Sequence, residues 1–237
     1  DGQAVLHHDV SLQRCAGVRG RIDRTPQAAL AELDVGSHFH KRFHGEPIPT
    51  LAQALAKLLD LGLSANLEIK PAPGFEAETA AETVRLAREL WPADAPQLLL
   101  SSFQRRSLQR VAELAPELPR ALIADRRPHA WRRELAELGC CALHLSRRWT
   151  APAIVEAVQE AGYGVGLYTV NDPQEAATFH AWGVDCLITD RPDAVARALP
   201  APSAAARAFS SAVARKLSPV SSGSGRPRSP ADATAIP

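Results

Sequence analysis

The sequence contains no methionine, and its first residue is Asp1. Translation begins with methionine, and removal of that methionine normally leaves a small residue rather than an aspartate. We therefore interpret the chain of 237 residues as a processed form, a designed form or a fragment. No apolar run approaches the about 18 residues that a membrane-spanning helix requires, so no transmembrane segment is expected.

Cysteine and net charge are also scarce. The four cysteines show no C-x-x-C spacing, which argues against a zinc or dithiol redox site, and adjacent cysteines such as Cys140 and Cys141 rarely bridge each other. We expect free thiols, which fits a reducing, cytoplasmic location, although a targeting signal would precede Asp1. A net charge of +1 gives no reason to expect nucleic acid or an anionic membrane as a partner.

Short apolar runs alternate with helical patterns through most of the chain. The expected strands are Ala4–His8, Asn66–Lys70, Leu98–Phe103, Arg120–Ala124, Cys141–Ser146, Gly164–Thr169 and Cys186–Thr189. The expected helices are Leu51–Leu61, Ala77–Leu90, Arg106–Ala115, Ala130–Leu138, Ala153–Ala161, Pro173–Trp182 and Asp193–Leu199. Repeated βαβ units predict a parallel sheet, either a (β/α) barrel or a large open sheet. Neither G-x-G-x-x-G nor a P-loop is present, which removes the main support for nucleotide binding.

The composition changes near residue 200. The segment 200–237 is rich in Ala, Ser, Pro and Arg, and few large apolar residues follow Leu217. Such a segment buries too little surface to offset the entropy of ordering it. We expect one domain over residues 1–199 and a disordered tail over residues 200–237.

Polar residues gather at the carboxyl ends of the expected strands. They are His8, Asp9, Glu68, Lys70, Ser101, Ser102, Gln104, Tyr168, Thr169, Asn171, Thr189 and Asp190. In parallel α/β folds these ends share one rim, where active sites lie. The simpler interpretation is that strands end where polar loops begin, and it accounts for any one of these ends taken alone.

Glu68 and Lys70 are two residues apart, so both point to the same face of their strand. A carboxylate at the mouth of a barrel is suited to a hard cation, and a lysine beside it is suited to a phosphate oxygen. The structural alternative is a buried salt bridge between the two, which we consider less favoured because of the polar rim around them. His8 is a candidate general acid or base, although a histidine at a strand end is more often structural.

Six short segments, in order, resemble the glycerophosphodiester phosphodiesterase family. They are Val5–Asp9 followed by Leu12–Arg14, then Ile48–Leu51, Asn66–Lys70, Ser101–Phe103, Leu167–Asn171, and Gly183–Asp185 with Ile188–Pro192. The resemblance extends to about Leu199. Each segment is short, but their order makes them jointly specific.

The resemblance implies a (β/α)8 TIM barrel that hydrolyses glycerophosphodiesters to glycerol 3-phosphate and an alcohol with a divalent metal, Mg²⁺ or Ca²⁺. It places the proton donor to the leaving alcohol on His8, a metal-ligand glutamate on Glu68 and the phosphate-facing lysine on Lys70. Tyr168 would line the pocket where the family usually has Trp. The alternatives are a catalytically dead partial barrel that acts as an interaction module, and a related phospholipase-type phosphodiesterase.

The family's opening motifs are missing here. His-Arg-Gly, Glu-Asn-Thr and Glu-x-Asp would supply a further histidine, an arginine and two carboxylates. We therefore expect the first two βα units to be absent and the chain, expressed alone, to be poorly soluble and inactive. Seven expected strands and two absent ones exceed eight, so one assignment is wrong or lies outside the barrel; Arg120–Ala124 and Cys141–Ser146 are the weakest.

Two further patterns invite a binding interpretation. His38, His40 and His44 have a spacing that a transition metal would tolerate, but a loop does not fix their geometry. The arginine pairs at 105–106, 126–127, 132–133 and 147–148 would attract anionic lipid or phosphate. For both patterns we favour the structural interpretation, namely a variable loop and solvated faces paired with glutamates.

Overall fold

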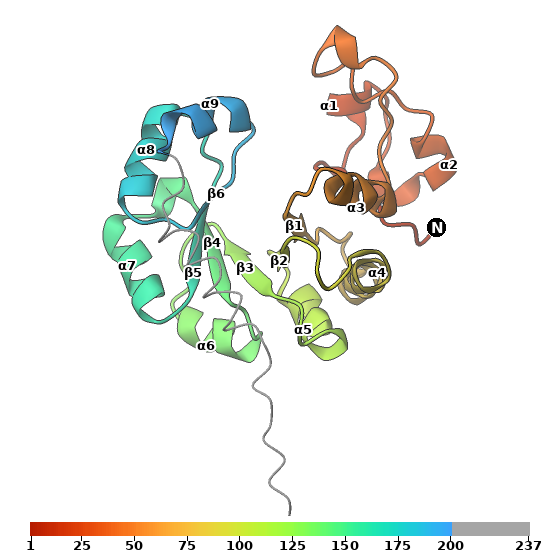
Figure 1. The fold of residues 1–237 in the computed structure, drawn as a ribbon. Helices are drawn as coiled ribbons and strands as arrows, with labels where there is room; N and C mark the ends of the chain where they lie inside the picture. The colour runs from red at the N-terminus through yellow and green to blue at the C-terminus, as the bar shows by residue number, and fades with distance from the viewer. Residues whose placement is uncertain (201–237) are drawn as a thin grey trace, which may run out of the picture.

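The computed structural model describes residues 1–200, and they form a curled parallel sheet with helices packed along its outer side (Figure 1). The six strands pair in chain order, each parallel to the next. They are β1 (Ala65–Glu68), β2 (Leu98–Ser102), β3 (Arg120–Ala124), β4 (Ala142–Ser146), β5 (Gly164–Tyr168) and β6 (Cys186–Leu187). The expected α/β class and parallel order are confirmed.

A helix follows each strand, as the spacing predicts. These are α4 (Glu76–Leu90), α5 (Arg105–Leu114), α6 (Trp131–Glu137), α7 (Pro152–Glu160), α8 (Pro173–Ala181) and α9 (Pro192–Ala198), while α3 (Leu51–Asp60) precedes β1. Thr50 and Gln53 form a capping box at the start of α3, which satisfies backbone N–H groups that the helix itself leaves free. Asp172 accepts from the backbone N–H of Gln174 at the start of α8.

The two faces of the sheet differ in chemistry. Leu143 and Leu145 of β4 pack against Trp131 of α6 and Val155 of α7 in the larger of the buried clusters of residues 1–200. His144 lies between these leucines and therefore points to the inner face. The inner face carries small or polar residues in register, namely Glu68, Ser101, Ala121, Ala142 and Gly164. The outward-facing leucines pack against the helices. The polar side chains of the inner face are therefore available for a site near the rim.

The first fifty residues form a separate small layer beside α3 (Figure 1). It contains two short helices, α1 (Gln13–Ala16) and α2 (Gln27–Leu30), and the 3-10 turns η1 (Ile22–Arg24) and η2 (Lys41–Phe43). These four elements were not expected. A third 3-10 turn, η3 (Arg147–Trp149), follows β4.

The expected strand Ala4–His8 is wrong. Val5 makes one isolated antiparallel bridge to Thr50, and Leu6 donates to the carbonyl of Pro49. The segment therefore pairs with the chain entering α3 rather than with the sheet. Only three apolar residues precede the polar His7–Asp9 sequence, and Leu6 remains 41% exposed, so little apolar surface favours insertion into a sheet.

The two strands that seemed weakest, β3 and β4, are regular and largely buried. Within residues 1–200, the outer edges of β1 and β6 pair with no further strand. No helix of the described residues is long and apolar enough to cross a membrane. The predicted disorder after residue 200 falls on residues 201–237, which lie outside the described part of the chain.

Candidate active site at the carboxyl ends of the strands

The rim expected from the sequence is present where β5 and β6 end. Asn171 donates to the Asp190 carboxylate at 2.9 Å, and its own side-chain oxygen accepts from Thr189 at 3.0 Å and from the backbone N–H of Asp190 at 2.8 Å. These contacts join two loops that are 19 residues apart in the chain. The polar strand ends thus share one edge of the sheet, as parallel topology requires.

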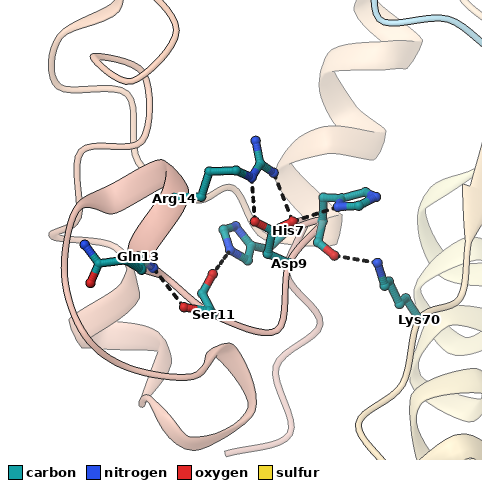
Figure 2. A network of polar contacts seen from close by, with 7 residues as sticks. His7, Asp9, Ser11, Gln13, Arg14 and Lys70 are labelled. Carbon is teal, nitrogen blue, oxygen red and sulfur yellow. Dashed lines mark hydrogen bonds and ion pairs between the residues drawn. The ribbon is translucent and has the colours of Figure 1, made fainter. Parts of the chain in front are cut away.

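The His-Asp segment is ordered by one carboxylate (Figure 2). Asp9 accepts two hydrogen bonds from Arg14, at 2.6 and 3.0 Å, and its Oδ1 lies 2.8 Å from Nδ1 of His8. The preceding histidine, His7, is directed elsewhere, since its Nε2 lies 3.2 Å from the carbonyl of Ser11. Only one of the two adjacent histidines therefore pairs with the acid, in keeping with their opposite orientations.

Asp9 determines which nitrogen of His8 is available. The Arg14 guanidinium, and next His8 itself, hold the pKa of the Asp9 carboxyl well below its usual range. An ionised Asp9 accepts a hydrogen bond from Nδ1–H of His8, which leaves Nε2 as the free nitrogen. The His8 side chain is 77% exposed, so Nε2 is accessible to a ligand.

Lys70 connects this segment to the sheet. Its Nζ donates to the backbone carbonyl of His8 at 2.6 Å, across 62 residues of sequence. Lys70 follows β1, the strand that carries Glu68, and both side chains are exposed. Within residues 1–200 Glu68 and Lys70 form no ion pair, so the alternative of a buried salt bridge is not what the structure shows. The predicted site residues His8 and Lys70 are therefore brought together.

Tyr168 ends β5 and is held on two sides. Its hydroxyl donates to Oδ1 of Asp125 at 3.0 Å, and its ring meets Phe103 edge-on with centroids 5.9 Å apart. Burial raises the pKa of Tyr168, and the negative charges of Asp125 and Glu68 act in the same direction. Glu68 is thus near enough to Tyr168 for its charge to raise the pKa of the phenol. Because this pKa is raised, Tyr168 is a neutral hydrogen-bond donor at physiological pH.

Sequence reasoning missed Asp125. It is the first residue after β3, so the rule that picked out the other polar strand ends would also have found it. Arg14 was noted as part of a motif without a role, although it is the principal partner of Asp9. Both residues act through a neighbour, which a strand-end pattern does not reveal.

The described residues alone do not provide a complete set of ligands for a divalent metal. Glu68 supplies one carboxylate, and residues 1–200 contain no group of three or more His, Cys, Asp or Glu side chains arranged to hold an ion. Mg²⁺ and Ca²⁺ take about six or more oxygen ligands.

In the loop at 34–44, His44 pairs with Asp34 at 2.7 Å and His40 accepts from the backbone N–H of Arg42, in keeping with the structural interpretation of that loop.

Two polar atoms on the inner face have no partner. Oγ of Ser101 and Nδ1 of His144 are buried and form no hydrogen bond within the described residues. Burial lowers the pKa of His144 to about 4, so its ring is neutral at physiological pH. His144 pairs in register with Gly166, one level below the Ser146–Tyr168 pair at the rim.

A curled parallel sheet with helices outside and polar side chains gathered at the carboxyl ends is the arrangement that enzymes of the α/β-barrel type share. Residues 1–194 match the model of the glycerophosphoryl diester phosphodiesterase family, and the chain belongs to that family. The resemblance seen in the sequence is thereby confirmed. The matched relatives named below are phosphoric diester hydrolases, and the family is generally metal-dependent.

Individual relatives agree with this assignment. The chain is 27% identical to a glycerophosphodiester phosphodiesterase of Caldanaerobacter subterraneus over 81% of this chain and 79% of that one. A phosphodiesterase of Oleispira antarctica, solved in complex with the product sn-glycerol-3-phosphate, superposes with a TM-score of 0.81 at 35% identity and covers 83% of this chain and 79% of its own. A glycerophosphodiester phosphodiesterase of Agrobacterium tumefaciens gives a TM-score of 0.62 at 25% identity over 81% of this chain and 80% of its own.

Proposed function

We propose that this chain carries the active site of an enzyme that hydrolyses glycerophosphodiesters to glycerol 3-phosphate and an alcohol. The observation that best supports this proposal is the 2.6 Å hydrogen bond from Lys70 Nζ to the backbone carbonyl of His8. It brings the His-Asp segment against the end of the strand that carries Glu68. Membership of the family and the similarity to a structure that holds sn-glycerol-3-phosphate support the substrate class.

His8 is the proposed proton donor to the leaving alcohol. Asp9 holds Nδ1 at 2.8 Å, so Nε2 is the nitrogen from which the protonated ring would donate, and the exposed ring is accessible to the departing oxygen. Protonating an alkoxide as it leaves avoids the build-up of a strongly basic group, which is the usual contribution of a general acid. Arg14 positions Asp9 and thereby the imidazole.

Lys70 is the proposed phosphate-binding residue. An ammonium group has three hydrogens, and one of them is used on the carbonyl of His8. The others are available to a phosphate oxygen, where a positive charge stabilises negative charge that develops during the reaction. Tyr168 lines the same rim, and its hydroxyl is committed to Asp125, so we assign it to shaping the pocket rather than to proton transfer.

Glu68 is the proposed metal ligand for Mg²⁺ or Ca²⁺. The described residues do not form a cation site on their own, so a bound ion requires further ligands. The proposed roles of His8 and Lys70 do not involve the ion.

Release of glycerol 3-phosphate tests the proposal. We would assay the 237-residue chain and the longest in-frame translation of its gene against glycerophosphodiesters with choline, ethanolamine and glycerol as leaving groups. We expect cation-dependent release from the longer product and none from the chain alone. Absence of release from the longer product with every divalent ion tried would refute the proposed function.

Paired histidine variants test the assignment of His8 in the longer product. His8→Ala should lower kcat by about 10²–10⁴-fold, the usual contribution of a general acid. His7→Ala is the matched control, because its ring contacts a backbone carbonyl instead of the acid, and it should retain most of the activity. Equal losses in the two variants would remove His8 from the proposed role.

A further inference from the structure

The arginine pairs noted in the sequence separate into two groups in the structure. One group forms ion pairs on solvated faces, as expected. Arg105 binds Glu134 at 2.7 Å and Arg147 binds Glu175 at 2.6 Å, while Arg133 lies 3.7 Å from Glu137. For these arginines the structural interpretation is sufficient.

The second group is stacked on tryptophan. The guanidinium of Arg126 lies 3.7 Å from the ring centroid of Trp149. Arg127 and Arg132 lie 5.8 and 4.5 Å from the centroid of Trp131. All three arginines are exposed, and none of them forms an ion pair within residues 1–200.

No carboxylate within residues 1–200 forms an ion pair with these three arginines. Asp125, the neighbour of Arg126, keeps its negative charge but directs Oδ1 to the Tyr168 hydroxyl rather than to Arg126. Glu134 and Glu137, on the same helix as Arg132, are engaged by other arginines. A cation–π contact orients a guanidinium without neutralising it. The three guanidinium groups therefore stay charged and without an ion-pair partner in the described residues. The net charge of +1 for the whole chain does not reveal this local excess of positive charge.

Trp149 adds an apolar element to this surface. It lies in η3, directly after β4, and is 52% exposed, while Trp131 is buried under its two arginines. An exposed indole between basic groups is the combination found where proteins meet the boundary between lipid headgroups and acyl chains. We call Arg126, Arg127, Arg132 and Trp149 the Arg–Trp patch.

The Arg–Trp patch borders the candidate site. Arg126 follows Asp125, which holds Tyr168 at the end of β5. Arg147, at the start of η3, donates to the backbone carbonyl of Thr169, the residue after Tyr168. The patch and the rim of the site are therefore joined through Asp125 and Arg147, which follow β3 and β4 on one side of β5.

We propose that the Arg–Trp patch docks this protein on a bilayer surface that contains anionic phospholipid. Its charges complement the headgroups, and the edge of Trp149 is free to enter the interface. A free phosphate would not require the exposed indole. A nucleic acid base would stack on an aromatic face, but Arg126 already covers a face of Trp149. The inference concerns a surface outside the proposed catalytic residues and does not depend on turnover.

Vesicle binding tests this inference without an activity assay. The purified chain would be sedimented without vesicles, with vesicles of pure phosphatidylcholine and with vesicles of equal parts phosphatidylcholine and phosphatidylglycerol, in low and in high salt, and the protein that sediments alone would be subtracted. We expect binding to the mixed vesicles that weakens in high salt. Equal binding to both vesicles, or to neither, would refute the proposal. Binding to single-stranded DNA in the absence of vesicle binding would identify a nucleic acid partner instead.

Matched arginine variants localise the binding. Each basic side chain near an anionic surface contributes about fivefold to partitioning, so R126Q/R127Q/R132Q should lower the partition coefficient roughly 100-fold. The control R85Q/R88Q/R110Q removes three arginines that are ion-paired to glutamates, two of them exposed and Arg110 half-buried, and it should bind like the parent.

Two further variants separate charge from folding. R126K/R127K/R132K retains the charge and should retain binding, whereas Trp149→Ser should weaken binding without changing its salt dependence. Circular dichroism checks that each variant is folded. Binding by the glutamine variant equal to that of the parent, or an equal loss in the control, would overturn the assignment.

Discussion

Gly166 of β5 lies beside His144 of β4, and the histidine ring occupies the space that a side chain at position 166 would need. A Cβ atom there would lie 2.5 Å from Cδ2 of the ring and 3.1 Å from its Cγ and Nε2. Carbon atoms in contact are about 3.5–4.0 Å apart, so Gly166→Ala forces a movement of about 1 Å. The ring is 2% exposed, and Ile123 pairs in register on its other side, so little room is available.

The expected cost follows from these distances. Overpacking a well-filled core costs about 1–3 kcal/mol, while replacing glycine restricts the unfolded chain and returns about 0.4–1 kcal/mol. Gly166→Ala should therefore lower the free energy of unfolding by about 1–2 kcal/mol, or the melting temperature by about 2–8 °C for a chain of this size. Urea unfolding followed by circular dichroism measures the first quantity, and a thermal melt measures the second.

Gly164→Ala is the matched control on the same strand and face. A Cβ at position 164 would lie 3.4 Å from the Cβ of Ala142, at ordinary contact distance, so this change should be neutral or slightly stabilising. Adding His144→Ala to Gly166→Ala removes the overlap, so the double variant should be more stable than the sum of the two single changes predicts. Equal stability of the two alanine variants, or strict additivity in the double variant, would refute the reasoning.

Four other predictions follow from single contacts. Thr50→Ala removes one half of the capping box of α3 and should cost about 1 kcal/mol in urea unfolding; an unchanged midpoint would contradict the role of the cap. The pKa of buried His144 falls from 6.5 to about 4, so the unfolded chain binds the proton more readily and stability should decline as the pH falls from about 6.5 to about 4. His144→Leu should flatten that decline, and a persistent slope would assign it elsewhere. Asp9→Asn should lower kcat of the longer gene product more than it changes KM, because it releases His8 rather than the substrate; a change confined to KM would argue otherwise. Chelation should abolish turnover of the longer product. Calorimetry of the 237-residue chain should show only weak Mg²⁺ binding, and tight binding would show that this chain supplies further ligands beside Glu68.

The repeating part of the fold was predictable because it follows local rules. Six of the seven expected strands and all seven expected helices occur, with ends within about two residues. The failure at Ala4–His8 arose because its apolar residues pair with the chain before α3, at Thr50 and Pro49, which are more than forty residues away. Periodicity detects an extended segment but not the partner that it pairs with.

The strand count correctly implied that one assignment lay outside the barrel, but the doubt fell on β3 and β4 instead of on Ala4–His8. Arg120 and His144 are polar residues within the otherwise apolar runs of β3 and β4. Arg120 is nevertheless buried, and its guanidinium donates to the carbonyls of Leu138 and Leu118 at 2.8 Å. Leu118 is a local partner, but Leu138 is 18 residues away and is brought near by the tertiary fold. A polar residue in an apolar run is thus poor evidence against a strand when its partners lie elsewhere in the sequence.

The candidate site shows how local motifs become a single chemical unit. Spacing identified His8 and Lys70 separately, as an acid or base and as an anion-binding group, but it gave no relation between them. The ammonium of Lys70, which we propose binds phosphate, also holds the backbone of the proposed proton donor His8, and Asp9 pairs with the His8 ring. Loss of Lys70 should therefore impair both charge stabilisation and the placement of the acid, so Lys70→Ala and His8→Ala should combine less than additively in kcat. Fully additive losses would show that the two residues act independently and that the 2.6 Å bond between them has no part in the reaction.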